Sequence, residues 1–251
     1  MSRGLGDVYK RQIIAIAASE LGKAVSKETR VDILVTPLVT IFSGVGLSML
    51  IAAPIGAAAS QVGTLIMWAT EQAPLVMGIL VSVIVGVALT LPISSAAICA
   101  ALGLTGLAGG AAVAGCCAQM IGFAVMSYKE NGVGGLVSQG LGTSMLQMPN
   151  ILRNPRTWIP PTLAAAITGP IATCLFHLEM NGPAVSSGMG TCGLVGQIGV
   201  YTGWIESGKA VTAFDWIGLV LICFVLPAVL STIFCEVLRK KGWIKERDLK
   251  L

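Results

Sequence analysis

The stretch from Gln72 to Tyr128 reads QAPLVMGILVSVIVGVALTLPISSAAICAALGLTGLAGGAAVAGCCAQMIGFAVMSY and contains no Asp, Glu, Lys or Arg. A helix needs about 20 predominantly apolar residues to cross the hydrocarbon core of a bilayer. The stretch is therefore long enough for two passes through a membrane. Burial of the whole stretch in a soluble core is the alternative, and the composition of the rest of the chain argues against it.

Hydrophobic residues make up 55% of the 251 positions and charged residues only 11%. A soluble domain carries about 25% charged residues, so this chain could not cover a surface that faces water. The composition predicts an all-α polytopic membrane protein, a helical bundle in a lipid bilayer, and excludes a soluble globular enzyme.

The net charge of +4 does not indicate a nucleic-acid partner, because the basic residues gather in clusters between apolar segments. The largest cluster lies in residues 239–251, directly after an apolar segment, which is typical of a cytoplasmic flank. We therefore predict a multi-pass membrane protein with a cytoplasmic basic tail. The basic residues of this tail are Arg239, Lys240, Lys241, Lys245, Arg247 and Lys250.

Neither the cysteines nor the single histidine forms a pattern for metal binding or catalysis. The seven cysteines all fall in apolar stretches without metal-ligand spacing, which is typical of small buried thiols. We expect no metal, no cofactor and no catalytic residue. The opening MSRGLGDVYKRQ lacks an apolar signal region and resembles translated adapter read-through, so we expect residues 1–12 to be non-native and the native N-terminus to be missing.

Four apolar segments have the length and composition of membrane spans: Ile33–Ala53, Pro74–Leu91, Trp158–Leu178 and Trp216–Leu238. Residues 54–74 are less apolar and are expected to form an interfacial or lining segment. Residues 131–150 contain too many polar groups for a membrane span and are expected not to cross.

An internal repeat links two parts of the chain at an offset of 78 residues. The stretch ALTLPI at 88–93 matches AITGPI at 166–171, and Gln119 then aligns with Gln197. Chance similarity between two glycine-rich segments is the alternative. As a true duplication, with copies at about 75–128 and 153–206, the pattern predicts two re-entrant hairpins rich in small residues.

The basic clusters all fall on one side if the hairpins at 93–127 and 179–204 each return to the side from which they start. The two copies then have opposite orientations in the membrane. Inverted repeats whose broken elements meet at mid-membrane are a transporter architecture. Within the domain at 13–238, the sequence thus predicts a helical bundle with an inverted repeat.

Ionisable residues are scarce around the second predicted hairpin. Glu179 is the only charged residue between Arg156 and Glu206, and His177 is the only histidine. Intramembrane ionisable groups usually mark a substrate or ion route, although both residues could also be simple interfacial charges. The further candidates for binding a polar substrate are Asn181, Ser187, Thr191, Gln197 and the aligned Gln119.

The motif GMGTCGLVGQIG at 188–199, with LGTSMLQMPNILRNP at 141–155, resembles the EIIC-type sugar permease family of the phosphotransferase system, which includes the perfringolysin regulator-like proteins. The resemblance covers roughly residues 13–238. It implies sugar uptake across the bacterial plasma membrane, coupled to phosphorylation by separate soluble phosphocarrier subunits. In better-understood permeases of this type a hairpin glutamate and a nearby histidine hold the sugar, which points to Glu179 and His177. The chain departs from them in lacking a Gly-Ile-Thr-Glu motif.

The sequence leaves two other functions open. The chain could be an ion- or proton-coupled secondary transporter of a small polar solute, or a membrane regulator that does not transport. The expected partners are a sugar or small polar solute, the soluble phosphocarrier subunits and the lipid bilayer, and a homodimer is left open. No nucleic acid is expected.

Overall fold

The computed structural model describes residues 39, 41–42 and 61–251. The predicted leader at 1–12 and nearly all of the predicted first span, Ile33–Ala53, lie outside the described residues. Most of the predicted interfacial segment at 54–74 also lies outside them, and its last part belongs to a helix over 61–72.

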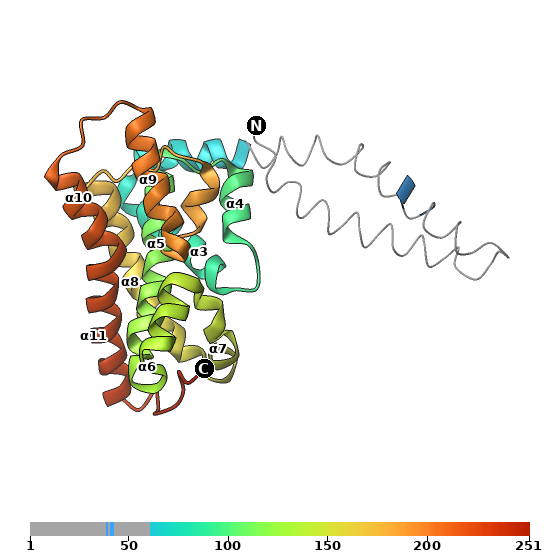
Figure 1. The fold of residues 1–251 in the computed structure, drawn as a ribbon, viewed down its shortest axis with the longest axis vertical. Helices are drawn as coiled ribbons and strands as arrows, with labels where there is room; N and C mark the ends of the chain where they lie inside the picture. The colour runs from blue at the N-terminus through green and yellow to red at the C-terminus, as the bar shows by residue number, and fades with distance from the viewer. Residues whose placement is uncertain (1–38, 40, 43–60) are drawn as a thin grey trace.

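The described part of the chain is helical, without a β-strand, and its long helices form a bundle (Figure 1). Three continuous helices are long and apolar enough to cross a membrane: α5 at Gly106–Met126, Pro155–Leu175 and Ala213–Lys240. The second comprises η3 (Pro155–Trp158), α8 (Ile159–Pro170) and η4 (Ile171–Leu175), and the third comprises α10 (Ala213–Val220), η7 (Leu221–Val225) and α11 (Leu226–Lys240). A fourth apolar helix, α3 at Pro74–Thr90, is shorter. The prediction of an all-α polytopic membrane protein is confirmed.

Local sequence explains where several of these helices start and stop. Pro74 occupies the first turn of α3, where its missing amide hydrogen costs nothing. Helix α4 (Ser95–Leu102) begins after Ser94, whose hydroxyl accepts from the amide of Ala97, and ends at Gly103 in the left-handed conformation. Thr212 and Asp215 form a reciprocal capping box at the start of α10.

Small residues bring α3, α5 and α8 into close contact. A Cβ added at Gly86 of α3 would lie 2.7 Å from the carbonyl oxygen of Gly115 in α5. One turn earlier on α3, the Ser82 hydroxyl donates to the carbonyl of Ala165 in α8 over 2.8 Å. Such close backbone approach is how helices associate where lipid removes the hydrophobic driving force.

Residues 93–127 were predicted to form a re-entrant hairpin, and this prediction is not confirmed. Most of the glycine-rich stretch forms the continuous helix α5, which is largely buried at the centre of the bundle. Its glycines do not break it because they serve as contact points: Gly110 faces the backbone of Leu178, and Gly122 faces Ser231. The turns in this region lie before α5, one between α3 and the short α4 and one at Gly103 between α4 and α5.

The aligned segment after residue 180 does fold back on itself. Glycines at 182 and 203 bring its two arms together, because a Cβ at Gly203 would lie 2.7 Å from the amide nitrogen of Gly182. The arms consist of η5 (Ala184–Gly188), η6 (Cys192–Leu194) and α9 (Val195–Glu206). We call residues 181–206 the second hairpin. Because its proposed counterpart is a straight helix, the predicted inverted repeat is not confirmed either.

A further hairpin lies at residues 128–153, which the sequence left as a non-crossing segment. It comprises α6 (Tyr128–Val137), a π turn η1 (Ser138–Gly142), η2 (Ser144–Gln147) and α7 (Met148–Arg153). We call residues 128–153 the first hairpin. Its two ends lie beside the C-terminal end of α11, since Lys129 pairs with Glu236 over 2.9 Å and Asn154 donates to the carbonyl of Trp243.

The two hairpins therefore start from opposite ends of the bundle (Figure 1). The second starts beside the N-terminus of α5, where the backbones of Met180 and Gly106 exchange two hydrogen bonds of 3.0 Å.

Charge is divided between the same two ends. Of the ten Lys and Arg residues in 61–251, only Lys209, in the loop between α9 and α10, lies at the end where the second hairpin starts. We call the opposite end the basic end. Its nine basic residues are Lys129, Arg153, Arg156, Arg239, Lys240, Lys241, Lys245, Arg247 and Lys250.

Candidate functional site

The tips of the two hairpins meet inside the bundle. The Thr191 hydroxyl of the second hairpin donates to the carbonyl of Gly140 in the first over 2.6 Å, and both atoms are buried. The same hydroxyl lies 3.5 Å from the sulfur of Met120 in α5. Met120 is roughly 20 Å along α5 from Gly106, at 1.5 Å per residue, so the tips meet deep within the bundle.

Both tips carry the pattern Gly-x-Gly-Thr. It reads GLGT at 140–143 and GMGT at 188–191. In the second tip the backbone requires glycine at position 190. Gly190 has φ +53°, and a Cβ there would lie 2.7 Å from the Cβ of Cys116. Only glycine tolerates both the left-handed backbone and the close approach.

Amide side chains hold the first hairpin from within. Gln139 donates to the Ser127 hydroxyl over 2.8 Å, and Gln147 donates to the side-chain oxygen of Gln139 over 2.9 Å. Gln147 also donates to the main-chain carbonyl of Leu249 over 3.0 Å, and Asn150 donates to the side-chain oxygen of Gln147. All three amide side chains are buried, so each needs these partners.

The predicted site residue Gln119 belongs to a separate polar cluster on the α3 and α8 side of α5. Its amide donates to Thr162, and its carbonyl oxygen accepts from Thr90 and from the indole of Trp158 over 3.1 Å. The Thr90 hydroxyl lies 2.9 Å from that of Ser144 in the first hairpin. Gln119 is thus fully buried and occupied in linking helices.

The structure places the predicted site residues Glu179, His177 and Asn181 together at the surface, where the second hairpin starts. All three are exposed, and Asn181 donates to a carboxylate oxygen of Glu179 over 2.9 Å. The backbone of His177 has φ +43°, a strained value for a residue that is not glycine. These residues form a polar rim at the mouth of the hairpin.

The remaining predicted residues, Ser187, Thr191 and Gln197, are buried within the second hairpin. Ser187 donates to the carbonyl of Leu104 over 2.6 Å. The amide nitrogen of Gln197 lies 3.2 Å from the sulfur of Cys117, and its side-chain oxygen has no hydrogen-bond partner in the described structure. The predicted set therefore divides into an exposed rim, a buried interior and the separate Gln119.

Sequence reasoning missed the polar residues of the first hairpin, notably Gln139, Ser144 and Gln147. The available signal was the shared Gly-x-Gly-Thr pattern, which pairs 140–143 with 188–191. The repeat at an offset of 78 residues instead paired α5 with the second hairpin.

No group of three or more His, Cys, Asp or Glu side chains that could hold a metal ion occurs among residues 61–251. The polar side chains in the interior of the second hairpin, Ser187, Thr191 and Gln197, offer hydroxyl and amide groups for hydrogen bonding. These groups suit an uncharged polar ligand.

A comparison with known protein families identifies the family of this chain. The model of the family described as phosphotransferase system, EIIC, matches residues 1–251. The chain belongs to this EIIC family. Neither the curated proteins nor the solved structures gave a match.

Membership makes this EIIC protein a membrane permease subunit for sugar, working with the partner proteins of the phosphotransferase system. The resemblance inferred from the sequence is thereby confirmed. Its apolar helices, with exposed residues such as Ile84, Ile217 and Ile233, fit a surface that faces lipid. The bacterial plasma membrane and the side that the C-terminus faces stay predictions, and a homodimer stays open.

Proposed function

We propose that this EIIC protein conducts its sugar between the two hairpins, along a route that starts at the Glu179 rim and continues past the buried interior of the second hairpin. The observation that carries the proposal is the contact of Thr191 with Gly140, where hairpins from opposite ends of the bundle meet. Broken elements that enter from opposite sides and meet near mid-membrane are typical of transporters that alternate access around a fixed site.

The rim has the chemistry of a first sugar contact. A carboxylate accepts two or more hydrogen bonds, which suits neighbouring sugar hydroxyls. Glu179 is exposed, and within residues 61–251 its carboxylate accepts only from Asn181, which leaves one of its oxygens for a ligand. His177 lies two residues away and can donate or accept.

Within the hairpin, Gln197 is the residue we assign to the sugar. Its buried side-chain oxygen lacks a donor in the described structure, and a sugar hydroxyl would supply one. Ser187 and Thr191 line the same hairpin and already donate to main-chain carbonyls, so their oxygens can still accept. The side-chain amide and carbonyl of Gln119 already form hydrogen bonds within the bundle, so we assign this residue a structural role.

The test is sugar uptake into vesicles that contain the protein and the soluble phosphocarrier subunits. Uptake should require phosphoenolpyruvate and should persist when an ionophore collapses the ion gradients. Uptake that the ionophore abolishes would instead indicate an ion-coupled transporter, and ligand binding without flux would indicate a regulator.

Glu179→Gln should weaken sugar affinity about tenfold or more, since it removes a charge-assisted hydrogen bond, and should leave the fold intact. Glu206→Gln, an exposed carboxylate at the same end of the bundle, is the matched control and should be near neutral. Equal behaviour of the two variants would remove Glu179 from the route.

We further propose that the basic end faces the cytoplasm, because basic residues favour that side. After Cys174 and Cys192 are replaced by Ser, a cysteine at position 207 should react with an impermeant reagent from outside. A cysteine at position 129 should not react. The reverse pattern would invert the orientation.

A further inference from the structure

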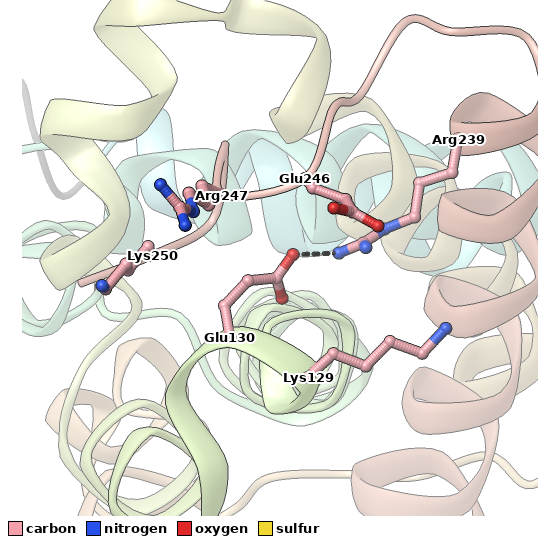
Figure 2. Close-up of a pocket in the computed structure, with 6 residues that line it drawn as sticks. All are labelled: Lys129, Glu130, Arg239, Glu246, Arg247 and Lys250. Carbon is pink, nitrogen blue, oxygen red and sulfur yellow. Dashed lines mark hydrogen bonds and ion pairs between the residues drawn. The ribbon is translucent and has the colours of Figure 1, made fainter.

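A cavity of about 300 Å³ lies at the basic end, between the start of the first hairpin, the end of α11 and the C-terminal tail (Figure 2). Four cationic and two anionic side chains line it, which gives a net charge of +2 when all are ionised. The lining residues are Lys129, Glu130, Arg239, Glu246, Arg247 and Lys250.

Two of the four cations are already paired with carboxylates. Arg239 donates to one oxygen of Glu130 over 2.6 Å, which Figure 2 draws as a dashed line. Lys129 pairs with Glu236 over 2.9 Å. The side chains of Arg247 and Lys250 have neither a hydrogen bond nor an ion pair within residues 61–251, and both residues are exposed. These two cations are therefore available to an anion.

Glu130 adds a hydrogen-bond acceptor that lacks a donor. Its side chain is only 8% exposed, and its other carboxylate oxygen is buried without a hydrogen-bond partner in the described structure. A buried carboxylate oxygen is an acceptor and needs a donor, such as a hydroxyl group. The cavity thus combines free cations with an acceptor that lacks its donor.

We propose that this cavity binds the phosphate monoester of a sugar, with the phosphate between Arg247 and Lys250 and a sugar hydroxyl donating to Glu130. The inference rests on the proposed function, in which phosphorylated sugar leaves the protein at the basic end. A phosphate monoester carries a charge of about −1.5 to −2 at pH 7, which is opposite in sign to the net charge of the cavity. The volume lies at the lower end of the range for small-ligand pockets.

Other ligands fit less well. A free sugar would leave both cations without a partner. A phosphodiester in a lipid headgroup carries a single negative charge, and only some headgroups bring a hydroxyl. The phosphate is common to lipid and sugar phosphate, so the experiment has to separate the two.

The test uses the full chain, purified in detergent, and isothermal titration calorimetry with glucose 6-phosphate, inorganic phosphate and glucose. We expect saturable binding of glucose 6-phosphate that is at least about tenfold tighter than that of inorganic phosphate, with glucose not binding at this site. The double variant Arg247→Gln with Lys250→Gln should weaken the binding of glucose 6-phosphate by about tenfold or more.

The matched control is Lys240→Gln with Lys245→Gln. It removes the same charge from the same end, and its two exposed lysines do not line the cavity. This control should bind glucose 6-phosphate within about twofold of the parent. Equal losses in the two double variants, or equal affinities for glucose 6-phosphate and inorganic phosphate, would overturn the proposal.

Repeating the titration in nanodiscs separates a lipid site from a sugar phosphate site. Binding that persists in phosphatidylcholine but disappears in phosphatidylglycerol would assign the cavity to lipid and overturn the proposal. Vesicle uptake tests the proposed function separately. Failed uptake with intact binding would refute the transport route and support this site, whereas intact uptake without binding would refute this inference alone.

Discussion

The two hairpins reach the same depth of the bundle and carry the same Gly-x-Gly-Thr tip, but they are held in different ways. The second hairpin is held by backbone against backbone: Gly188 lies against the main chain of Ser95, and Gly203 against that of Gly182. The first is held by hydrogen bonds between buried amide side chains, which continue into the tail. The two hairpins therefore differ in how far each can move before it loses the contacts that hold it.

Close backbone packing is sensitive to added volume and insensitive to polarity. An amide network is sensitive to the loss of any one member, because the remaining groups stay buried without partners. The first hairpin also depends on a segment of chain about a hundred residues away, since Gln147 and Asn150 donate to the carbonyls of Leu249 and Lys250. The four predictions below test this contrast, from the largest expected effect to the smallest.

Gly188→Ala should be the most damaging change. Its Cβ would lie 2.5 Å from the carbonyl oxygen of Ser95, a main-chain atom that cannot move aside cheaply. We expect a loss of about 3 kcal/mol in the free energy of unfolding, measured by thermal unfolding in detergent.

The control for Gly188→Ala is Gly134→Ala in the first hairpin. A Cβ at Gly134 meets nothing within 4 Å, and alanine favours a helix over glycine by up to about 1 kcal/mol. Equal destabilisation by the two substitutions would show that tight backbone packing does not distinguish the hairpins.

Gln147→Leu should destabilise the first hairpin by about 2 kcal/mol, because the buried side-chain oxygen of Gln139 loses its donor and the amide of Asn150 loses one of its two acceptors. Thermal unfolding and limited proteolysis of the tail are the measurements. Gln72→Leu, at an exposed position, should change neither. Unchanged proteolysis in Gln147→Leu would mean that the network does not hold the tail.

Leu249→Ala should act locally. Leu249 is fully buried, and its truncation should loosen the tail by about 2 kcal/mol. Hydrogen exchange should therefore rise at 128–153 and stay unchanged at 181–206. Leu251→Ala, at a position 48% exposed, is the control. A rise in both hairpins would show that they are coupled through their tips.

Glu236→Gln should have the smallest effect. Its pair with Lys129 ties the first hairpin to α11, but the two side chains are 44% and 70% exposed. Exposed ion pairs contribute at most about 1 kcal/mol, and added salt should reduce the difference further. A larger loss, unchanged by salt, would show that this pair anchors the hairpin.

The membrane class and most helices could be predicted from the sequence, because long apolar segments without charge rarely occur in soluble proteins and are typical of membrane spans. The stretch at 72–128 and the last apolar segment before Arg239 carried that information, and α3, α5 and most of α11 lie within them. The gathering of basic residues at one end could also be predicted, because basic residues that flank membrane spans favour one side of the membrane.

The hairpins could not be placed in the same way, since glycine has two uses in a membrane bundle. In α5, Gly110 and Gly115 allow close contact with neighbouring backbones, whereas Gly190 and Gly193 adopt left-handed turns. Composition does not separate these uses. The polar residues of the first hairpin led to a different error. Gln139 and Gln147 indicated that this segment does not insert into the bundle, but both side chains form hydrogen bonds with partners inside the protein.

The contacts between the first hairpin and the tail have a consequence for mutational drift. Asn131, Gln147, Asn150 and Asn154 all donate to main-chain carbonyls of the tail. A main-chain carbonyl is the same whatever residue carries it, so substitutions at exposed tail positions leave these contacts unaltered. A random substitution library over 128–154 and 241–251 would therefore retain the four amides under selection for stability, while exposed positions of the tail would vary.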